Sequence, residues 1–120
     1  MVGELQGSFA LSKTAITEAV AEGVGGTYLL SEGKRSENNR LIVSFVGMAD
    51  DLREGLMRHV GSAAGYTHFW YRSCDNIADA YLQACNDYHL YSRVAILKSG
   101  HPKKTSGAWP DCPTCEKRTI

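Results

Sequence analysis

Residues 26–47 hold two apolar runs and a polar interval, in the order GTYLLSEGKRSENNRLIVSFVG. The runs at residues 27–30 and 41–46 are rich in β-branched, aromatic and aliphatic residues, a composition typical of buried strands. The interval between them, residues 31–40, is polar throughout. Strands joined by so short a connection pair in antiparallel fashion, so this stretch predicts a β-hairpin with an exposed loop.

Helices and one further strand surround this hairpin. Apolar residues recur at helical spacing over residues 11–20 and again over 52–60, where Asp50 or Asp51 is a suitable N-cap. Residues 66–71 alternate as a strand does, and Asn76 precedes the last long helical pattern. A shorter helix is expected over residues 92–98. The pattern predicts an α+β domain, with a small three-stranded antiparallel sheet flanked by helices.

A length of 120 residues suits one domain. We expect residues 1–25 to form an N-terminal helical extension, residues 26–98 the main domain, and residues 99–120 a tail packed on it. Thirteen basic residues balance thirteen acidic ones, so binding to nucleic acid requires a local basic patch. The sequence contains no apolar run long enough to cross a bilayer, and its start does not read as a signal peptide. These features predict a cytoplasmic protein with no membrane partner.

Cysteine and histidine residues in the last third of the chain have the spacing of a metal site. Cys85 and His89 are four residues apart and share one helical face, while Cys112 and Cys115 flank a short turn. His101, which precedes a proline, is an equally suitable imidazole donor. Three thiolates and either histidine complete a tetrahedral shell, so we predict a structural zinc that tethers the tail to the last helix.

Several of these segments together resemble the GIY-YIG nuclease domain, in the subgroup with a terminal Cys-Pro-x-Cys pair. Gly26-Thr27-Tyr28 and Phe45-Val46-Gly47 match its paired tripeptides, and the likeness extends to about Cys115. The resemblance implies that Tyr28 and a second tyrosine help to deprotonate the attacking water, near a histidine at His59. It also implies an arginine that stabilises the phosphorane and a glutamate that holds a divalent cation.

This sequence departs from that pattern at four positions, one of which is Ala49, where the pattern has a small hydroxyl residue after the second tripeptide. Phe45 replaces the second tyrosine, Gly55 stands at the arginine position, and Ala84 stands at the glutamate position. Loss of a cation that meets phosphoryl charge costs ~10³-fold or more in comparable sites. Magnesium, which needs hard oxygen ligands, is therefore expected only if the chain is active. The nearby replacements in the sequence are Asp87 for the carboxylate and Arg53 or Arg58 for the arginine, of which Arg58 lies closer to Gly55 around the helix.

Three functions follow from these residues. The leading one is a catalytically inactive GIY-YIG-like domain that binds nucleic acid, with DNA favoured, or a protein partner. The first alternative is a divergent metal-dependent DNA endonuclease that uses Tyr28, His59 and Asp87. The second is a zinc-stabilised protein-interaction domain with no nucleic-acid role. The cations we expect to contact phosphates are Lys34, Arg35, Arg58, Lys103 and Lys104.

Overall fold

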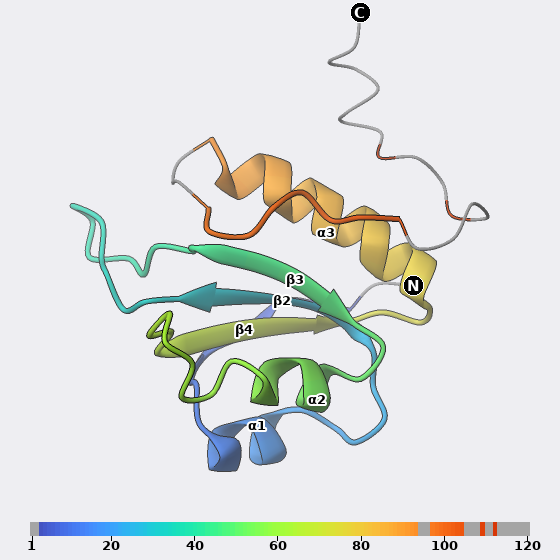
Figure 1. Ribbon diagram of the computed structural model, residues 1–120, viewed down its shortest axis with the longest axis horizontal. Helices are drawn as coiled ribbons and strands as arrows, with labels where there is room; N and C mark the ends of the chain where they lie inside the picture. Colours follow the sequence, from blue (N-terminus) through green and yellow to red (C-terminus); the bar gives the residue numbers. More distant parts are fainter. Residues whose placement is uncertain (1–2, 94–96, 105–108, 110–111, 113–120) are drawn as a thin grey trace, which may run out of the picture.

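A four-stranded antiparallel sheet with helices on both faces makes up the domain (Figure 1). The computed structural model describes residues 3–93, 97–104, 109 and 112. The sheet order is β1-β4-β2-β3. In chain order the elements are β1 (Gln6–Ala10), α1 (Lys13–Ala19), β2 (Gly26–Ser31), β3 (Phe45–Ala49), α2 (Leu52–Met57), β4 (His68–Ser73) and α3 (Ile77–Tyr91).

The prediction of three strands is wrong by one, because β1 adds a strand from the segment expected to be purely helical. β1 pairs with β4, with Gln6 opposite Tyr71 and Ala10 opposite His68. Its sequence, QGSFA, contains little of the apolar alternation that marks a strand, and most of it is exposed. The helix expected next in the chain does form, and the Ser12 side chain accepts a hydrogen bond from the Ala15 amide at its start.

The predicted hairpin is confirmed, although its second strand is displaced along the chain. β3 begins at Phe45 and runs through Gly47 to Ala49, whereas we expected it over residues 41–46. Gly47 lies opposite Tyr28 in the β2–β3 register, and the Tyr28 ring fills the space that a Cβ at Gly47 would occupy. The glycine therefore continues the strand under the ring, whereas the predicted strand stopped at residue 46.

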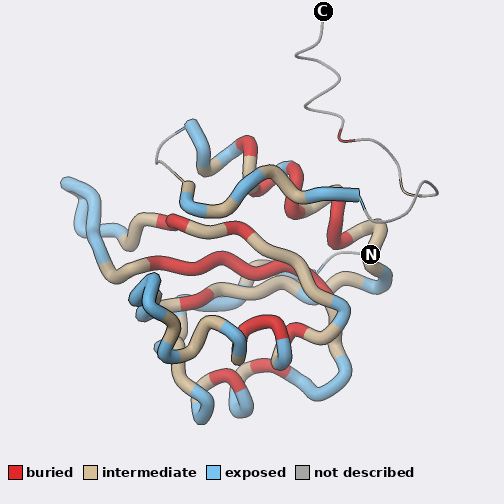
Figure 2. The backbone as a smooth tube through the Cα atoms, in the orientation of Figure 1, coloured by how far each residue is buried: buried red, intermediate tan, exposed pale blue. Residues whose placement is uncertain are grey.

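Two apolar cores lie on the two faces of the sheet, and β2 contributes to both. Tyr28 and Leu30 face α1 and α2, while Leu29 faces α3. Every residue of β2 is buried, as Figure 2 shows along the middle of the sheet. The alternation expected over residues 66–71 also holds in β4, although the strand lies two residues further along the chain, at His68–Ser73. Phe69 packs in the first core and Trp70 against the second.

Two arginine residues fix the helices to the rest of the domain. The Arg53 guanidinium donates to the carbonyl oxygens of Val20 at 2.6 Å and Thr17 at 2.8 Å, at the C-terminal end of α1. Arg72 on β4 pairs with Asp87 on α3 at 3.0 Å, and both side chains are largely buried. Gln83 also donates to the Asp87 carboxylate. Burial raises the pKa of Asp87, although Arg72 opposes that shift.

The segment after α3 returns along the outer edge of β3, beside α3 (Figure 1). The Lys98 amide donates to the Ser44 carbonyl at 2.7 Å, and the Val46 amide donates to the Ser99 hydroxyl at 2.9 Å. The short helix expected over residues 92–98 lies partly outside the described residues, and Leu97 and Lys98 are not helical. Among the helices that the structure describes, none combines the length and apolar character needed to span a membrane.

The buried ion pair between β4 and α3 gives a test of the packing. Arg72→Met should lower the free energy of unfolding by about 3–5 kcal/mol, because it leaves Asp87 buried without its cation. In this variant, stability should rise as the pH falls, since the raised pKa of Asp87 means that the folded form takes up a proton more readily. Urea unfolding at several pH values measures both effects.

The double variant Arg72→Met, Asp87→Leu is the matched control for this measurement. It removes both charges and should recover most of the lost stability. A single variant that unfolds at the wild-type urea concentration would contradict the assignment of this pair as a structural contact.

Candidate functional site

An open cleft of about 630 Å³ lies at the carboxyl end of β3. Its walls come from β2 and β3, from α2, from the start of α3, and from the C-terminal segment. The polar side chains that line it belong to Tyr28, Asp50, Asp51, Glu54, Arg58, His59, Lys103 and Trp109. The cleft therefore joins residues that are far apart in the sequence.

A tyrosine and a histidine that line this cleft contact one another. The Tyr28 hydroxyl lies 3.0 Å from Nε2 of His59, which sits in the turn after α2. Burial raises the pKa of Tyr28 to about 12, so the phenol keeps its proton at neutral pH. Burial and the neighbouring Arg58 lower the pKa of His59. With its ring proton on Nδ1, a neutral His59 accepts the phenol hydrogen at Nε2.

Two more aromatic rings hold this pair in place. Phe45 stacks on Tyr28 with ring centroids 6.1 Å apart and meets the edge of His59 at 4.9 Å. Tyr66 contacts His59 edge-on at 5.8 Å. Phe45 thus preserves the packing that a tyrosine ring would give, but it supplies no hydroxyl.

Gly55 on α2 packs directly against Ala49 on β3. A Cβ atom at this position would stand 2.8 Å from the Cβ of Ala49, closer than real Cβ contacts occur. The helix and strand are therefore packed too tightly here for an arginine side chain in the present arrangement. The nearest arginine on the cleft wall is Arg58, which pairs with Glu54 at 2.7 Å and is exposed.

Gly55 and Ala84, where the resemblance implies an arginine and a glutamate, do not share one site, because the sheet separates these positions. Ala84 is fully buried against Leu29, Val43 and Val46, on the face covered by α3. It does not line the cleft, in contrast to Gly55. Asp87, the expected replacement for a metal-binding glutamate, is engaged by Arg72 and also lies outside the cleft lining.

The candidate phosphate-contacting cations are divided between two ends of the molecule. Arg58 and Lys103 line the cleft. Lys34 and Arg35 lie in the β2–β3 loop, at the opposite end of these strands from the cleft (Figure 1). The Lys104 ammonium donates to the Trp109 carbonyl at 3.5 Å and does not line the cleft. The five predicted cations therefore do not form one continuous basic surface.

Four of the polar residues that line the cleft were not predicted as site residues from the sequence. Asp50 and Asp51 were expected only as helix caps, and Asp51 does accept a hydrogen bond from the Glu54 amide at the start of α2. Glu54 was overlooked, although its four-residue spacing from Arg58 is a recognisable ion-pair signal. Trp109 gave no local signal, because only the path of the tail brings it to the cleft.

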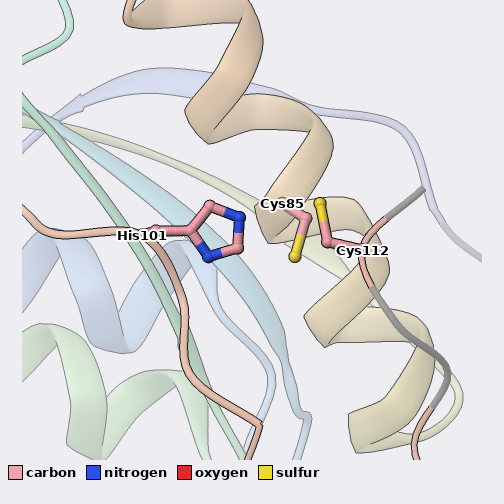
Figure 3. Close-up of side chains that lie close together, drawn as sticks. All are labelled: Cys85, His101 and Cys112. Carbon is pink, nitrogen blue, oxygen red and sulfur yellow. The ribbon is translucent and has the colours of Figure 1, made fainter. Parts of the chain in front are cut away.

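A second group of side chains, next to the cleft, has the composition of a metal site. Cys85 from α3 meets His101 and Cys112 from the C-terminal segment, as Figure 3 shows. One ligand atom from each residue lies within 4.8 Å of the other two. Both cysteines are buried. Two thiols and an imidazole are donors suited to a soft or borderline metal ion, so this group can hold one.

The structure brings His101, not His89, into this metal-binding group. The His89 ring is buried and packs against the His101 ring, with centroids 5.0 Å apart, but His89 is not one of the three residues of the group. Cys115, the expected fourth ligand, lies outside the described residues. Trp109 packs on Tyr81 in a small apolar cluster that also contains Cys85 and Cys112, so the metal-binding group adjoins one wall of the cleft.

Comparison with protein-family models, with curated proteins and with solved structures finds nothing that matches this chain. Its function must therefore be argued from the two sites themselves.

The titration of His59 tests the geometry of the cleft. In the wild-type protein its pKa should lie below 6.5, and Arg58→Gln should raise that pKa without bringing it fully to 6.5, since burial remains the larger cause. Protonation of His59 then disfavours the folded state, so its contribution to stability is lost as the pH falls below about 6.5. Chemical shifts of the histidine ring, followed by NMR against pH, measure the pKa.

Tyr66→Phe is the matched control, because it keeps the ring that packs against His59. It should leave the pKa of His59 lowered. A wild-type pKa at or above 6.5 would show that His59 is more exposed than this packing allows.

Proposed function

We propose that this chain is a GIY-YIG-like domain that binds nucleic acid at the cleft and does not cut it. The observation that carries the proposal is the hydrogen-bonded Tyr28–His59 pair in a cleft that Arg58 and Lys103 also line. Two cations beside neutral hydrogen-bonding groups suit a phosphodiester, whose oxygens accept from both kinds of donor. The antiparallel pairing of the two tripeptides, with Tyr28 opposite Gly47, supports the family resemblance.

The same cleft argues against hydrolysis by the mechanism that the resemblance implies. Gly55 packs against Ala49, and Ala84 is buried on the other face of the sheet, so neither position supplies charge to the cleft. A phenol with a pKa of about 12 is also a poor base at neutral pH. Of the carboxylates at the cleft, Asp51 caps a helix and Glu54 pairs with Arg58.

One observation favours the alternative of a divergent endonuclease. Arg58 lines the cleft directly beside His59 and has a long, exposed side chain. In that reading Arg58 would meet the charge on the phosphorane, and a divalent cation would supply Lewis-acid chemistry on the phosphate. We rank it second because Asp87, its expected carboxylate, is already paired with Arg72.

We further infer that the metal is zinc, with a structural role, held by Cys85, His101 and Cys112, and by Cys115 as the fourth ligand. Zinc is supported by the sulfur and imidazole donors, and a closed shell of four protein ligands leaves no position for substrate. The cytoplasm, where thiols stay reduced, is the compartment we infer for such a site. The zinc would attach the tail to α3 and contribute to folding of that segment.

The zinc assignment predicts about one zinc ion per chain in protein purified without oxidants. Cys85→Ser and His101→Ala should each lower the zinc content strongly, because each removes a ligand from the shell. Elemental analysis by plasma mass spectrometry gives the content. Cys74→Ser is the control and should leave it unchanged, since Cys74 lies outside the metal-binding group. Wild-type protein with little bound zinc would refute the zinc assignment.

Nucleic-acid binding predicts a measurable dependence on salt and on the two cleft cations. Arg58→Gln and Lys103→Gln should each weaken binding to a fluorescein-labelled DNA several-fold and reduce the slope of log affinity against log salt by about one. Fluorescence anisotropy at several salt concentrations measures both quantities. Lys34→Gln is the matched control, because it removes a cation at the far end of the sheet and should leave the affinity close to wild type.

Incubation with plasmid and branched DNA in Mg²⁺ or Mn²⁺ separates the two candidate functions. We expect no cleavage. Cleavage that disappears in Tyr28→Phe would establish the endonuclease in place of the proposed function. Failure to bind any nucleic acid would instead favour a protein-interaction domain.

A further inference from the structure

The charges on the cleft wall do not suit a long stretch of duplex backbone. Arg58 and Lys103 share the cleft with the carboxylates of Asp50, Asp51 and Glu54. Duplex DNA carries one negative charge for about every 1.7 Å of its axis, and carboxylates repel such a surface. The mixed lining is better matched to a ligand that carries few phosphates and also offers hydrogen-bond donors.

Trp109 adds an aromatic surface to this wall. Its ring packs against Tyr81 with centroids 5.5 Å apart, while the residue also lines the cleft. The Tyr81 residue is itself buried, so it gives the indole a fixed support within the domain. Stacking of a nucleobase on an aromatic side chain contributes about 1–3 kcal/mol to binding and is available to all bases.

The dimensions of the cleft also fit a small ligand. A volume of about 630 Å³ lies within the range of roughly 300–1,000 Å³ that is typical of small-molecule sites. Within the described part of the chain, Asp51 and Glu54 are held by contacts inside α2, which leaves Asp50 as the carboxylate best suited to meet a ligand. Amino groups on adenine, guanine and cytosine are suitable donors to such a carboxylate.

We propose that the cleft takes one unpaired nucleotide of a nucleic acid, with its base against Trp109 and its phosphate toward Arg58 and Lys103. The proposal rests on nucleic-acid binding as the function and names the form of substrate that the cleft selects. The Asp50 carboxylate accepts a hydrogen bond from an amino group of the base. This role explains why a cleft that binds phosphate also contains a carboxylate. A nucleotide at a single-stranded end, in a bulge or in a single strand fits this description, whereas a stacked base pair does not.

The metal-binding group supports the stacking wall of this site. His101 and Cys112 belong to that group, and the two cleft residues of the tail, Lys103 and Trp109, lie between them in the sequence. A metal ion that joins both ends to Cys85 therefore restricts where these two side chains can lie. Binding of the nucleotide and of the metal should strengthen one another, because coupling between two sites is reciprocal.

The experiment compares three labelled DNA probes of about 12 nucleotides, a length suited to single-strand sites, with the metal-loaded full-length chain. The probes are a single strand, the blunt duplex of the same sequence, and that duplex with one bulged nucleotide. We expect the single strand and the bulge to bind at least about tenfold more tightly than the blunt duplex, equivalent to about 1.4 kcal/mol. Anisotropy titration at constant salt measures all three affinities.

Variants at Trp109 test the stacking contact directly. Trp109→Ala should lower the affinity for the single strand by about tenfold or more, whereas Trp109→Phe should keep part of it, because a smaller ring still stacks. Trp70→Phe is the control, since Trp70 packs against the core under α3 and should not affect the preference. Circular dichroism establishes that each variant is folded before its affinity is compared.

Removal of the metal by a chelator provides an independent readout. The fluorescence of Trp109 is obtained as the difference between the spectra of wild type and Trp109→Phe. Its emission maximum should shift toward the wavelength of an exposed indole, with or without DNA. The preference for the single strand should be lost in the same sample. A chelated protein with unchanged emission and unchanged preference would refute the metal-supported wall.

The failure of this inference can be distinguished from failure of the proposed function. If blunt duplex binds as well as single strand, and Lys103→Gln weakens binding while Trp109→Ala does not, nucleic-acid binding stands and the unpaired-nucleotide site is refuted. If none of the three probes binds to the metal-loaded protein, both proposals fail together.

Discussion

Strand β2 is hydrogen-bonded to a strand on each side and buried on both faces, and the remaining elements are arranged around it. Its alternating side chains serve two different cores, with Tyr28 and Leu30 directed to α1 and α2 and Leu29 directed to α3. A shift of its register by one residue would exchange these faces, so the hairpin register also determines where Tyr28 lies. The site chemistry therefore depends on the packing of one strand.

Close packing at two glycine residues determines which side chains line the cleft. The Tyr28 ring lies over Gly47, and Gly55 lets α2 approach Ala49 on β3. These contacts bring the Tyr28 hydroxyl within reach of His59 just beyond the end of α2. The same tight packing removes the room for a long cationic side chain at Gly55, so the positioning of the tyrosine–histidine pair and the absence of that cation have a common physical origin.

The C-terminal segment connects the two sites. It runs along the edge of β3 through the Lys98 and Ser99 hydrogen bonds, then contributes His101 and Cys112 to the metal-binding group and Lys103 and Trp109 to the cleft. A metal ion held there would restrict the positions of Lys103 and Trp109 without itself touching a molecule bound in the cleft. Under the proposed function, such a metal would affect binding at the cleft as well as folding of the tail.

The sequence by itself determined the elements whose signals are local. The apolar run at residues 27–30 predicted β2, and the alternation over residues 66–71 predicted the two faces of β4. The polar residues before two helical patterns predicted N-caps, and the structure uses Asp51 and Asn76. These signals can be recognised because caps and periodicity act within a few residues. The weakly patterned strand β1 was missed, since its pairing with β4 supplies the order that its own residues do not.

Only the tertiary structure decided which distant residues share a site. It placed Ala84 behind the sheet, and it brought His101 rather than His89 to Cys85. It also carried Trp109 to the cleft, far along the chain from Tyr28. These outcomes depend on which face of a strand or helix meets which neighbour, and that is a property of the packed chain as a whole.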